Sequence, residues 1–254
     1  SFDSRAEAVA AAFGRIVGHI ADDPSHTRTL AALVDIVAKI DMLRCKAEVA
    51  HFFNLTRPTV VDSGEPSFVR CEGLRHLLVE KMQTRELYVT NDVGLGDCAR
   101  TNQGALLYGT NAVGKTCLIK AIGVSVVLAQ CGMYVPCTSM TISPYQQIFT
   151  RIESHDDIHR GLSTFAVEMS ELRTILKYSG PRSLVMGDEM CSGTENVSAL
   201  SIFMGGVEHL CRVRSSFVFA THFHEITALP QMKNLGMVKL MHMKVVYNPA
   251  TKAL

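Results

Sequence analysis

Eight consecutive residues combine two glycines, a lysine and a threonine at a spacing suited to phosphate binding. They read Gly109-Thr110-Asn111-Ala112-Val113-Gly114-Lys115-Thr116 and fit G-x-x-x-x-G-K-[ST] at every fixed position. Glycines let backbone N–H groups face a phosphate without a Cβ in the way. Lys115 would reach the β- and γ-phosphates of a nucleoside triphosphate, and the Thr116 hydroxyl would ligate Mg²⁺. The segment therefore predicts a P-loop.

The residues on either side of this segment support the prediction. Residues 104–108 are an apolar run typical of a buried strand, and residues 116–130 follow a helical pattern. A helix that starts at the loop adds the positive end of its dipole to the phosphate site. Cys117, in the first turn of that helix, has two interpretations: a buried filler residue, or a reactive thiol.

A pair of carboxylates follows a second apolar run. The run Ser183-Leu184-Val185-Met186 predicts a buried strand, and Asp188 and Glu189 stand where it ends. Asp188 could hold Mg²⁺ directly or through water. Glu189 is well placed to orient or deprotonate an attacking water, which favours hydrolysis over kinase chemistry. A solvated acidic pair at a strand end is the alternative, and it is less apt beside a P-loop.

A third predicted strand, residues 215–221, ends at His222, which could sense a γ-phosphate next to the P-loop strand. The strings His222-Phe223-His224-Glu225 and His155-Asp156-Asp157-Ile158-His159 are rich in metal-binding side chains. Neither has a third and a fourth ligand at a sensible spacing, so we predict no zinc site.

The order of the remaining patterns predicts two domains. Residues 5–20 and 28–53 each place apolar side chains on one helical face, and Asp22-Asp23-Pro24-Ser25 separates them. We therefore expect a helical hairpin over residues 1–56. From residue 57 to residue 254, short β-type runs alternate with helices, which predicts an α/β sheet with helices on its faces. The expected strands are residues 59–61, 68–71, 87–90, 105–108, 184–186 and 217–220.

Composition excludes several classes of protein. The 254 residues are 47% hydrophobic and 19% charged, with a formal net charge of +1, so no global field draws the chain to nucleic acid or to a membrane surface. The most apolar stretch, residues 121–135, is shorter than the about 20 residues that span a bilayer. Eight cysteines without a C-x-x-C pair indicate thiols in a reducing, intracellular compartment. The chain starts without Met, and we expect it to be a piece of a larger protein.

Four motifs in order resemble those of the MutS family of DNA mismatch repair ATPases. They are residues 109–116, Ser163-Thr164-Phe165-Ala166-Val167-Glu168-Met169, Asp188-Glu189, and Phe219-Ala220-Thr221-His222-Phe223-His224-Glu225. The similarity extends over about residues 28–247. The variant string at residues 188–195 looks more like the giant-virus and organellar branch than like ordinary bacterial members. The resemblance implies an ABC-type P-loop NTPase fold, ATP and Mg²⁺ as cofactors, ATP hydrolysis, and a composite site between two ATPase domains.

Site residues follow from the resemblance one by one. Gly114, Lys115 and Thr116 would bind phosphates and Mg²⁺, and Asn111 would also face phosphate. Asp188 would hold the metal.

The catalytic roles would fall to Lys115, to Glu189 as the base, and to His222, which resembles the family's switch histidine. Tyr88 matches the aromatic position that stacks on adenine, although an aromatic residue of strand core remains the alternative. Ser163 resembles the serine that reaches the partner's γ-phosphate in trans, and a helix cap formed by Ser163 or Thr164 is an open alternative.

The same resemblance leaves the biological role partly open. The mismatch-reading domain, the DNA clamp and the C-terminal helix-turn-helix of the family are not in this chain, so we expect the motor and not the reader. One hypothesis is a module whose nucleotide state controls a DNA clamp in mismatch repair. The other is a DNA-junction or recombination clamp on the same motor. A generic transporter or chromosome-maintenance ATPase lacks support, because S-T-F-x-V-E-M stands where those families carry a glycine-rich signature. Expected partners are a second such ATPase domain, in a homodimer or heterodimer, and double-stranded DNA, but no membrane. Nucleus, cytoplasm, organelle and viral factory all remain open.

Overall fold

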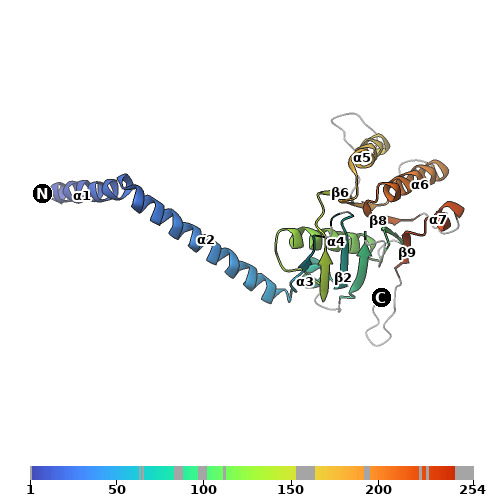
Figure 1. Ribbon diagram of the computed structural model, residues 1–254, viewed down its shortest axis with the longest axis horizontal. Helices are drawn as coiled ribbons and strands as arrows, with labels where there is room; N and C mark the ends of the chain where they lie inside the picture. The colour runs from blue at the N-terminus through green and yellow to red at the C-terminus, as the bar shows by residue number, and fades with distance from the viewer. Residues whose placement is uncertain are drawn as a thin grey trace. The chain divides into compact units, whose positions relative to one another are not determined.

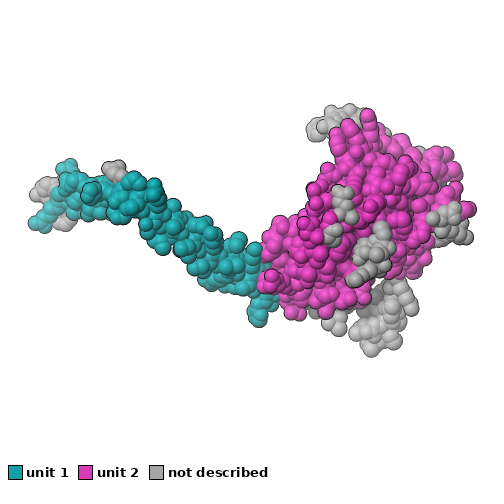
Figure 2. Space-filling view, in the orientation of Figure 1, with its two compact units in different colours: residues 1–52 teal, residues 53–254 magenta. Residues whose placement is uncertain are grey.

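The computed structural model describes residues 2–62, 64, 66–82, 88–96, 102–110, 113–152, 164–191, 195–222, 225–226 and 229–243. The chain divides into two compact units, residues 1–52 and residues 53–254 (Figure 2). The second unit holds both β-sheets and every residue predicted to do chemistry.

The first unit consists of two long helices, α1 (Phe2–Asp22) and α2 (Pro24–Phe52). Asp23 separates them and caps α2, because its carboxylate accepts a hydrogen bond of 2.8 Å from the Ser25 N–H. Pro24 takes the first helical position, where its missing N–H costs nothing.

The predicted hairpin is not what these helices form. The chain runs on from α1 into α2 instead of folding back along it (Figure 1). An antiparallel helix pair needs a connection of about 2–5 residues, and a single residue is too short. The predicted apolar faces are accordingly exposed, with Val9 at 69%, Phe13 at 67% and Val34 at 68%.

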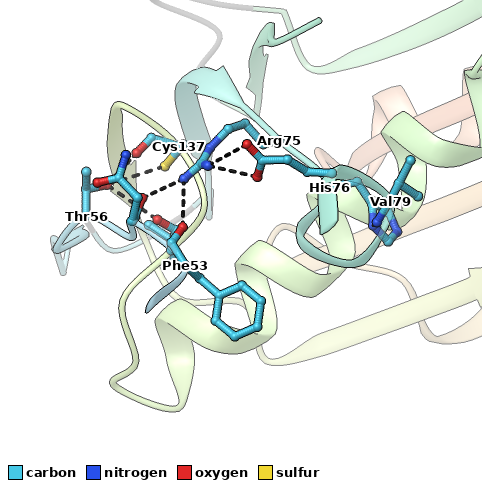
Figure 3. A network of polar contacts seen from close by, with 9 residues as sticks. Phe53, Thr56, Arg75, His76, Val79 and Cys137 are labelled. Atoms are coloured by element: carbon cyan, nitrogen blue, oxygen red, sulfur yellow. Dashed lines mark hydrogen bonds and ion pairs between the residues drawn. The ribbon is translucent and has the colours of Figure 1, made fainter. Parts of the chain in front are cut away.

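The unit boundary lies at residues 52/53 and not at the predicted 56/57. A network around Arg75 explains the difference (Figure 3). The Arg75 guanidinium donates to the backbone oxygens of Phe53 at 3.3 Å and Asn54 at 2.6 Å. It also forms a two-bond ion pair with the Glu80 carboxylate, at 2.9 and 2.8 Å. These contacts attach residues 53 and 54 to the second unit.

Thr56 strengthens the same attachment. Its backbone exchanges hydrogen bonds of 3.0 and 2.9 Å with Val135, and its hydroxyl donates to the Cys137 carbonyl at 2.6 Å. The four residues that follow α2 are therefore bound to the segment that leads into strand β5 (Ser139–Ile142), where sequence patterns alone had placed them with the helices.

A five-stranded parallel sheet is the centre of the second unit. Its order is β6-β7-β8-β4-β9, and each strand pairs in parallel with its neighbours. The strands are β4 (Gly104–Tyr108), β6 (Gln147–Arg151), β7 (Ser183–Asp188), β8 (Ser216–Thr221) and β9 (Val238–His242). Since all five run the same way, their carboxyl ends lie at one edge of the sheet.

Side chains of the central strands alternate between two cores, as the two-residue period of a strand requires. Leu107, Met186 and Val218 belong to one core, with helix α4 (Lys115–Gln130) and the second sheet. Leu106 and Phe217 belong to the other, with helices α5 (Thr164–Tyr178) and α6 (Asn196–Arg212) and the short helix α7 (Pro230–Asn234). The predicted α/β sheet with helices on its faces is confirmed.

The second sheet is mixed and has the order β1-β5-β2-β3. It contains β1 (Thr59–Val60), β2 (Val69–Leu74) and β3 (Asn91–Leu95) besides β5, and the short helix α3 (Leu77–Met82) follows β2. The strand predicted over residues 87–90 is wrong: residues 88–90 have no regular structure, and the strand begins at Asn91. Strands β5, β6 and β9 were not predicted.

Replacing Arg75 should loosen the second unit where α2 joins it. Arg75→Ala leaves the Glu80 carboxylate and the Asn54 carbonyl without their charged donor, which should lower the free energy of unfolding by about 1–3 kcal/mol. Arg75→Lys can serve fewer of these acceptors at once, so its loss should be smaller. Urea unfolding followed by circular dichroism measures both, with Arg173→Ala on α5 as a control for the loss of an exposed arginine. An Arg75→Ala chain as stable as the original would contradict this role.

Candidate active site

The residues predicted to do chemistry follow the ends of three neighbouring strands. In the order β7-β8-β4, Tyr108 lies level with Thr221, and Asp188 lies level with Ala220. The P-loop, the acidic pair and His222 each begin at the carboxyl end of one of these strands. Parallel pairing in this register therefore brings together residues that are up to 113 positions apart between Gly109 and His222.

The predicted P-loop connects β4 to α4 through Gly114, which has φ 95° and ψ 13°. This left-handed conformation is rare for residues with a Cβ, so glycine is required here by the backbone angle. Gly114 supplies no side-chain cap to the first turn of α4, whose N–H groups face the loop. The structure describes Gly109, Thr110 and Val113 of this loop, while the predicted Asn111 and Ala112 lie outside the described residues.

Lys115 is the first residue of α4 and is only 5% exposed. Its ammonium donates to the carbonyl oxygens of Gly109 at 2.5 Å and Thr110 at 3.1 Å. It also lies 3.5 Å from Nδ1 of His222. The positive charge is thus enclosed by the loop, where phosphate oxygens can take over from the carbonyls as acceptors.

Thr116 and Asp188 form a cluster of oxygen atoms beside the lysine. The Thr116 hydroxyl donates a hydrogen bond to Oδ2 of Asp188. Oδ1 of the same carboxylate is buried and has no hydrogen-bond partner. A buried carboxylate oxygen in this condition is costly unless a cation or a donor compensates it. Hydroxyl and carboxylate oxygens are the ligands that Mg²⁺ prefers, so these two residues fit the predicted metal site.

Glu189 lies in a turn directly after β7, with the unusual backbone angle φ 52°. Its N–H donates to the Ala220 carbonyl of β8 at 2.9 Å, which ties the turn to the neighbouring strand. Its side chain is 47% exposed and accepts a hydrogen bond from His222. A half-exposed carboxylate held by one donor can still contact water, as a general base must.

His222 connects Lys115 to Glu189. An ammonium has no acceptor, so Nδ1 of His222 must be the acceptor facing Lys115, and the ring proton is then on Nε2. That proton points at Oε1 of Glu189. The imidazole of His222 thus lies between the ammonium of Lys115 and the carboxylate of Glu189 and contacts both. The predicted trio of Lys115, Glu189 and His222 is one connected group.

Tyr88 lies beside the start of α4 and outside any strand, so the strand-core interpretation is wrong. Its hydroxyl is 3.6 Å from Sγ of Cys117, the residue after Thr116. Burial, reinforced by Cys117, raises the pKa of the Tyr88 phenol well above its ordinary value. The phenol is therefore neutral, and its hydroxyl lies beside the first turn of α4.

Two groups of residues singled out in the sequence lie outside the described part of the chain. Ser163 lies outside the described residues, and α5 begins at the next position, Thr164. His155, His159 and His224 also lie outside them. Within the described part of the chain, no group of three or more His, Cys, Asp or Glu side chains could hold a metal ion.

The sequence patterns assigned no role to one buried acid, Glu168. Glu168 of α5 is 3% exposed and accepts a hydrogen bond of 2.5 Å from the Cys191 N–H, next to the acidic turn. A signal for it was present, because Glu168, Leu172 and Ile175 follow the i, i+4, i+7 spacing of one helical face and all three are buried. A carboxylate on an apolar face requires a specific partner.

Two further features concern the helices and the cysteines. Among the described residues, no helix is long and apolar enough to cross a membrane. The cysteines that the structure describes are thiols and not disulfides.

Comparison with known proteins gives a consistent picture. A family model described as MutS domain V matches residues 105–253. A mitochondrial DNA mismatch repair protein mutS homologue of Sarcophyton glaucum is 37% identical over 208 residues, which are 81% of this chain and 21% of that protein. A putative mutS homologue of Acanthamoeba polyphaga mimivirus is 30% identical over an alignment of 257 positions, which covers 88% of this chain and 23% of the relative. The DNA mismatch repair protein MutS of Thermosynechococcus vestitus is 37% identical over 231 residues, 89% of this chain and 25% of the relative. The chain thus spans a quarter or less of the length of these relatives.

Proposed function

This chain belongs to the MutS family, and we propose that it is the ATP-binding and ATP-hydrolysing module of a DNA mismatch repair protein. The observation that carries the proposal is the meeting of two groups at the carboxyl ends of β4, β7 and β8. One is the connected trio Lys115, His222 and Glu189, and the other is the Thr116–Asp188 pair. An ABC-type arrangement of this sheet and its P-loop is part of the proposal.

Each residue has a distinct task in hydrolysis. Lys115 binds the β- and γ-phosphate oxygens in place of the loop carbonyls that it contacts. Thr116 and Asp188 hold Mg²⁺, which when bound offsets negative charge between the two phosphates. Glu189 accepts a proton from the attacking water, and the Nε2–H of His222 orients the Glu189 carboxylate.

His222 also links the phosphate-binding lysine to the proposed base. Its Nδ1 faces Lys115, whose ammonium moves toward the phosphates when they bind. When the ammonium shifts, Nδ1 of the imidazole loses its donor. The ring can then move, and its Nε2–H changes the orientation of the Glu189 carboxylate. This is how His222 senses the γ-phosphate. Tyr88, beside Cys117, stacks on the adenine.

We extend the proposal to the assembly and to the biological role. Ser163 completes the site of a second chain in trans, and the two ATPase domains form a homodimer or a heterodimer. The nucleotide state then controls a clamp on double-stranded DNA, through parts of the protein beyond this chain. A junction or recombination clamp on the same motor is the second candidate. A mismatch-reading wedge in the N-terminal region of the full gene would separate the two.

The branch of the family is a finer proposal. The string at residues 188–195 favours the giant-virus and organellar branch, and relatives from a mimivirus and from a mitochondrion are among the matches. Bacterial MutS proteins match at similar identity, 34% to 37%. A tree built on the full-length genes would test the placement.

The two principal charged residues should separate ATP binding from ATP hydrolysis. Lys115→Ala should abolish ATP binding, because the cation placed under the loop is lost. Glu189→Gln should bind ATP normally and hydrolyse it about 10²–10⁴-fold more slowly, because the geometry is kept and the base is lost. Equilibrium binding of a fluorescent ATP analogue and phosphate release measure the two steps.

Matched controls are available on the neighbouring helices. Lys177→Ala on α5 and Glu208→Gln on α6 make the same chemical changes at exposed positions away from the site. Both should behave as the original chain. Wild-type turnover in Glu189→Gln would remove Glu189 from the proposed role.

Mixing two inactive variants should test the composite site. Turnover per chain should rise with protein concentration, because the site is complete only in a dimer. Ser163→Ala should bind ATP but dimerise and hydrolyse poorly, and Glu189→Gln should accumulate an ATP-bound dimer. A mixed dimer contains one intact site, made from the P-loop and Glu189 of the first variant and Ser163 of the second. The mixture should therefore recover part of the activity. Turnover that is independent of concentration, with no recovery on mixing, would leave Ser163 as a helix cap only.

A further inference from the structure

A buried carboxylate of α5 lies directly under the turn that carries the proposed base. Glu168 is 3% exposed, and its Oε1 accepts the Cys191 N–H at 2.5 Å. Cys191 is only two residues after Glu189. This hydrogen bond between a buried side-chain oxygen and a backbone N–H links the helix to the turn.

The turn needs such a link because its backbone is strained. Glu189 and Cys191 both have positive φ, 52° and 66°, although neither is a glycine. Residues with a Cβ keep this conformation only where their surroundings hold them in it, and such strain is concentrated at functional sites. Two hydrogen bonds hold the turn, one at each end: Glu189 N–H to Ala220 of β8, and Cys191 N–H to Glu168 of α5.

An ion pair near the turn also connects α5 to the sheet. Arg151 lies at the end of β6, level with Gly187 of β7, and its Nε is 3.0 Å from the Glu171 carboxylate of α5. Burial, with a further contribution from Glu168, raises the pKa of the Cys191 thiol to about 12. Cys191 is therefore neutral at physiological pH and does not add a second negative charge beside Glu168.

The position of Glu168 along α5 gives the link a direction. The helix begins at Thr164, immediately after the proposed trans residue Ser163, and Glu168 lies about one turn further on. One turn of helix is stiff. A displacement at the start of α5 therefore reaches the Cys191 N–H through Glu168, and from there the strained turn that carries Glu189.

We propose that Glu168 is a positioning residue, which fixes the orientation of Glu189 and makes that orientation depend on where α5 lies. This inference rests on the proposed function. Contact of a second chain with the start of α5 would then set the base for hydrolysis, so that binding of the partner and chemistry are coupled through one hydrogen bond.

Three substitutions at Glu168 separate positioning from charge and from simple support of the core. Glu168→Gln keeps an oxygen acceptor at the same reach but loses the charge. Glu168→Asp keeps the charge but is one methylene too short, and Glu168→Ala has no acceptor. If the hydrogen bond positions Glu189, Glu168→Gln should retain most of the wild-type kcat. Glu168→Asp and Glu168→Ala should lose up to about 10²-fold in kcat, the effect of a small misplacement of a catalytic group.

The Michaelis constant and the fold provide the second readout. ATP affinity and KM should change less than about threefold in every variant, because the Glu168 carboxylate is bonded to the Cys191 N–H and forms no hydrogen bond with the described residues of the P-loop. Steady-state kinetics above the concentration at which turnover per chain levels off gives kcat and KM, and circular dichroism confirms that each variant is folded. Glu171→Gln, at the exposed acid of the same helix, is the matched control. Glu168→Asp is the less disruptive variant and decides the question if Glu168→Ala does not fold.

The outcomes distinguish this inference from its premise. An original chain with no ATP turnover would overturn the proposed function and, with it, the role of Glu168. Turnover in the original chain with an unchanged kcat in folded Glu168→Asp would overturn only the positioning role. A Glu168→Gln variant as impaired as Glu168→Ala would also overturn it, because charge and not the hydrogen bond would then be what matters.

Discussion

The parallel pairing of β7, β8 and β4 is the constraint on which the site depends. Side chains at the carboxyl end of one strand can meet those at the carboxyl end of another only if both strands run the same way and end at the same level. The pairing is parallel, and its register sets Asp188 level with Ala220 and Tyr108 level with Thr221. Lys115, the adjacent pair Asp188 and Glu189, and His222 come from three separate parts of the chain, and this sheet brings those parts together. The buried faces of the three strands hold that register, because a shift of one residue would exchange the two cores.

The elements that the sequence predicted well are those whose signals are local. The helix that begins at Lys115 and the strands ending at Tyr108, Asp188 and Thr221 each combine an apolar run with a glycine, a helix start or a polar end. The predictions were wrong where contacts between residues distant in sequence set the limits of an element or a unit. Residues 53 and 54 belong to the second unit because Arg75, more than 20 positions away, binds their carbonyls. Strand β3 starts at Asn91 and not at residue 87 because pairing with β2 sets its limits, and the aromatic Tyr88 contacts Cys117 instead.

The hairpin shows a different limit of sequence patterns. An apolar stripe on a helix shows that a face is suited to burial, but it does not say what covers it. Apolar side chains of both α1 and α2 are exposed, and the chain does not fold back between the two helices as the predicted hairpin requires. The single residue Asp23 decides the matter, because it caps α2 without leaving enough chain to reverse direction. Glu168 is the opposite case: its pattern placed a charge on a buried face, and the partner that explains it, the Cys191 N–H, becomes visible only in three dimensions.

The acidic turn after β7 unites these observations. Asp188 is the last residue of a buried strand, so its carboxylate is rigidly placed, and Thr116 holds one of its oxygens. Glu189, one residue later, has left the sheet and depends on contacts from β8, from His222 and, through Cys191, from α5. The two acids thus differ in how firmly they are held although they are adjacent in sequence. Such a division suits the proposed ATPase site, in which Asp188 would hold a metal at a constant position, while Glu189 would be ready as the base only when α5 is in the right place.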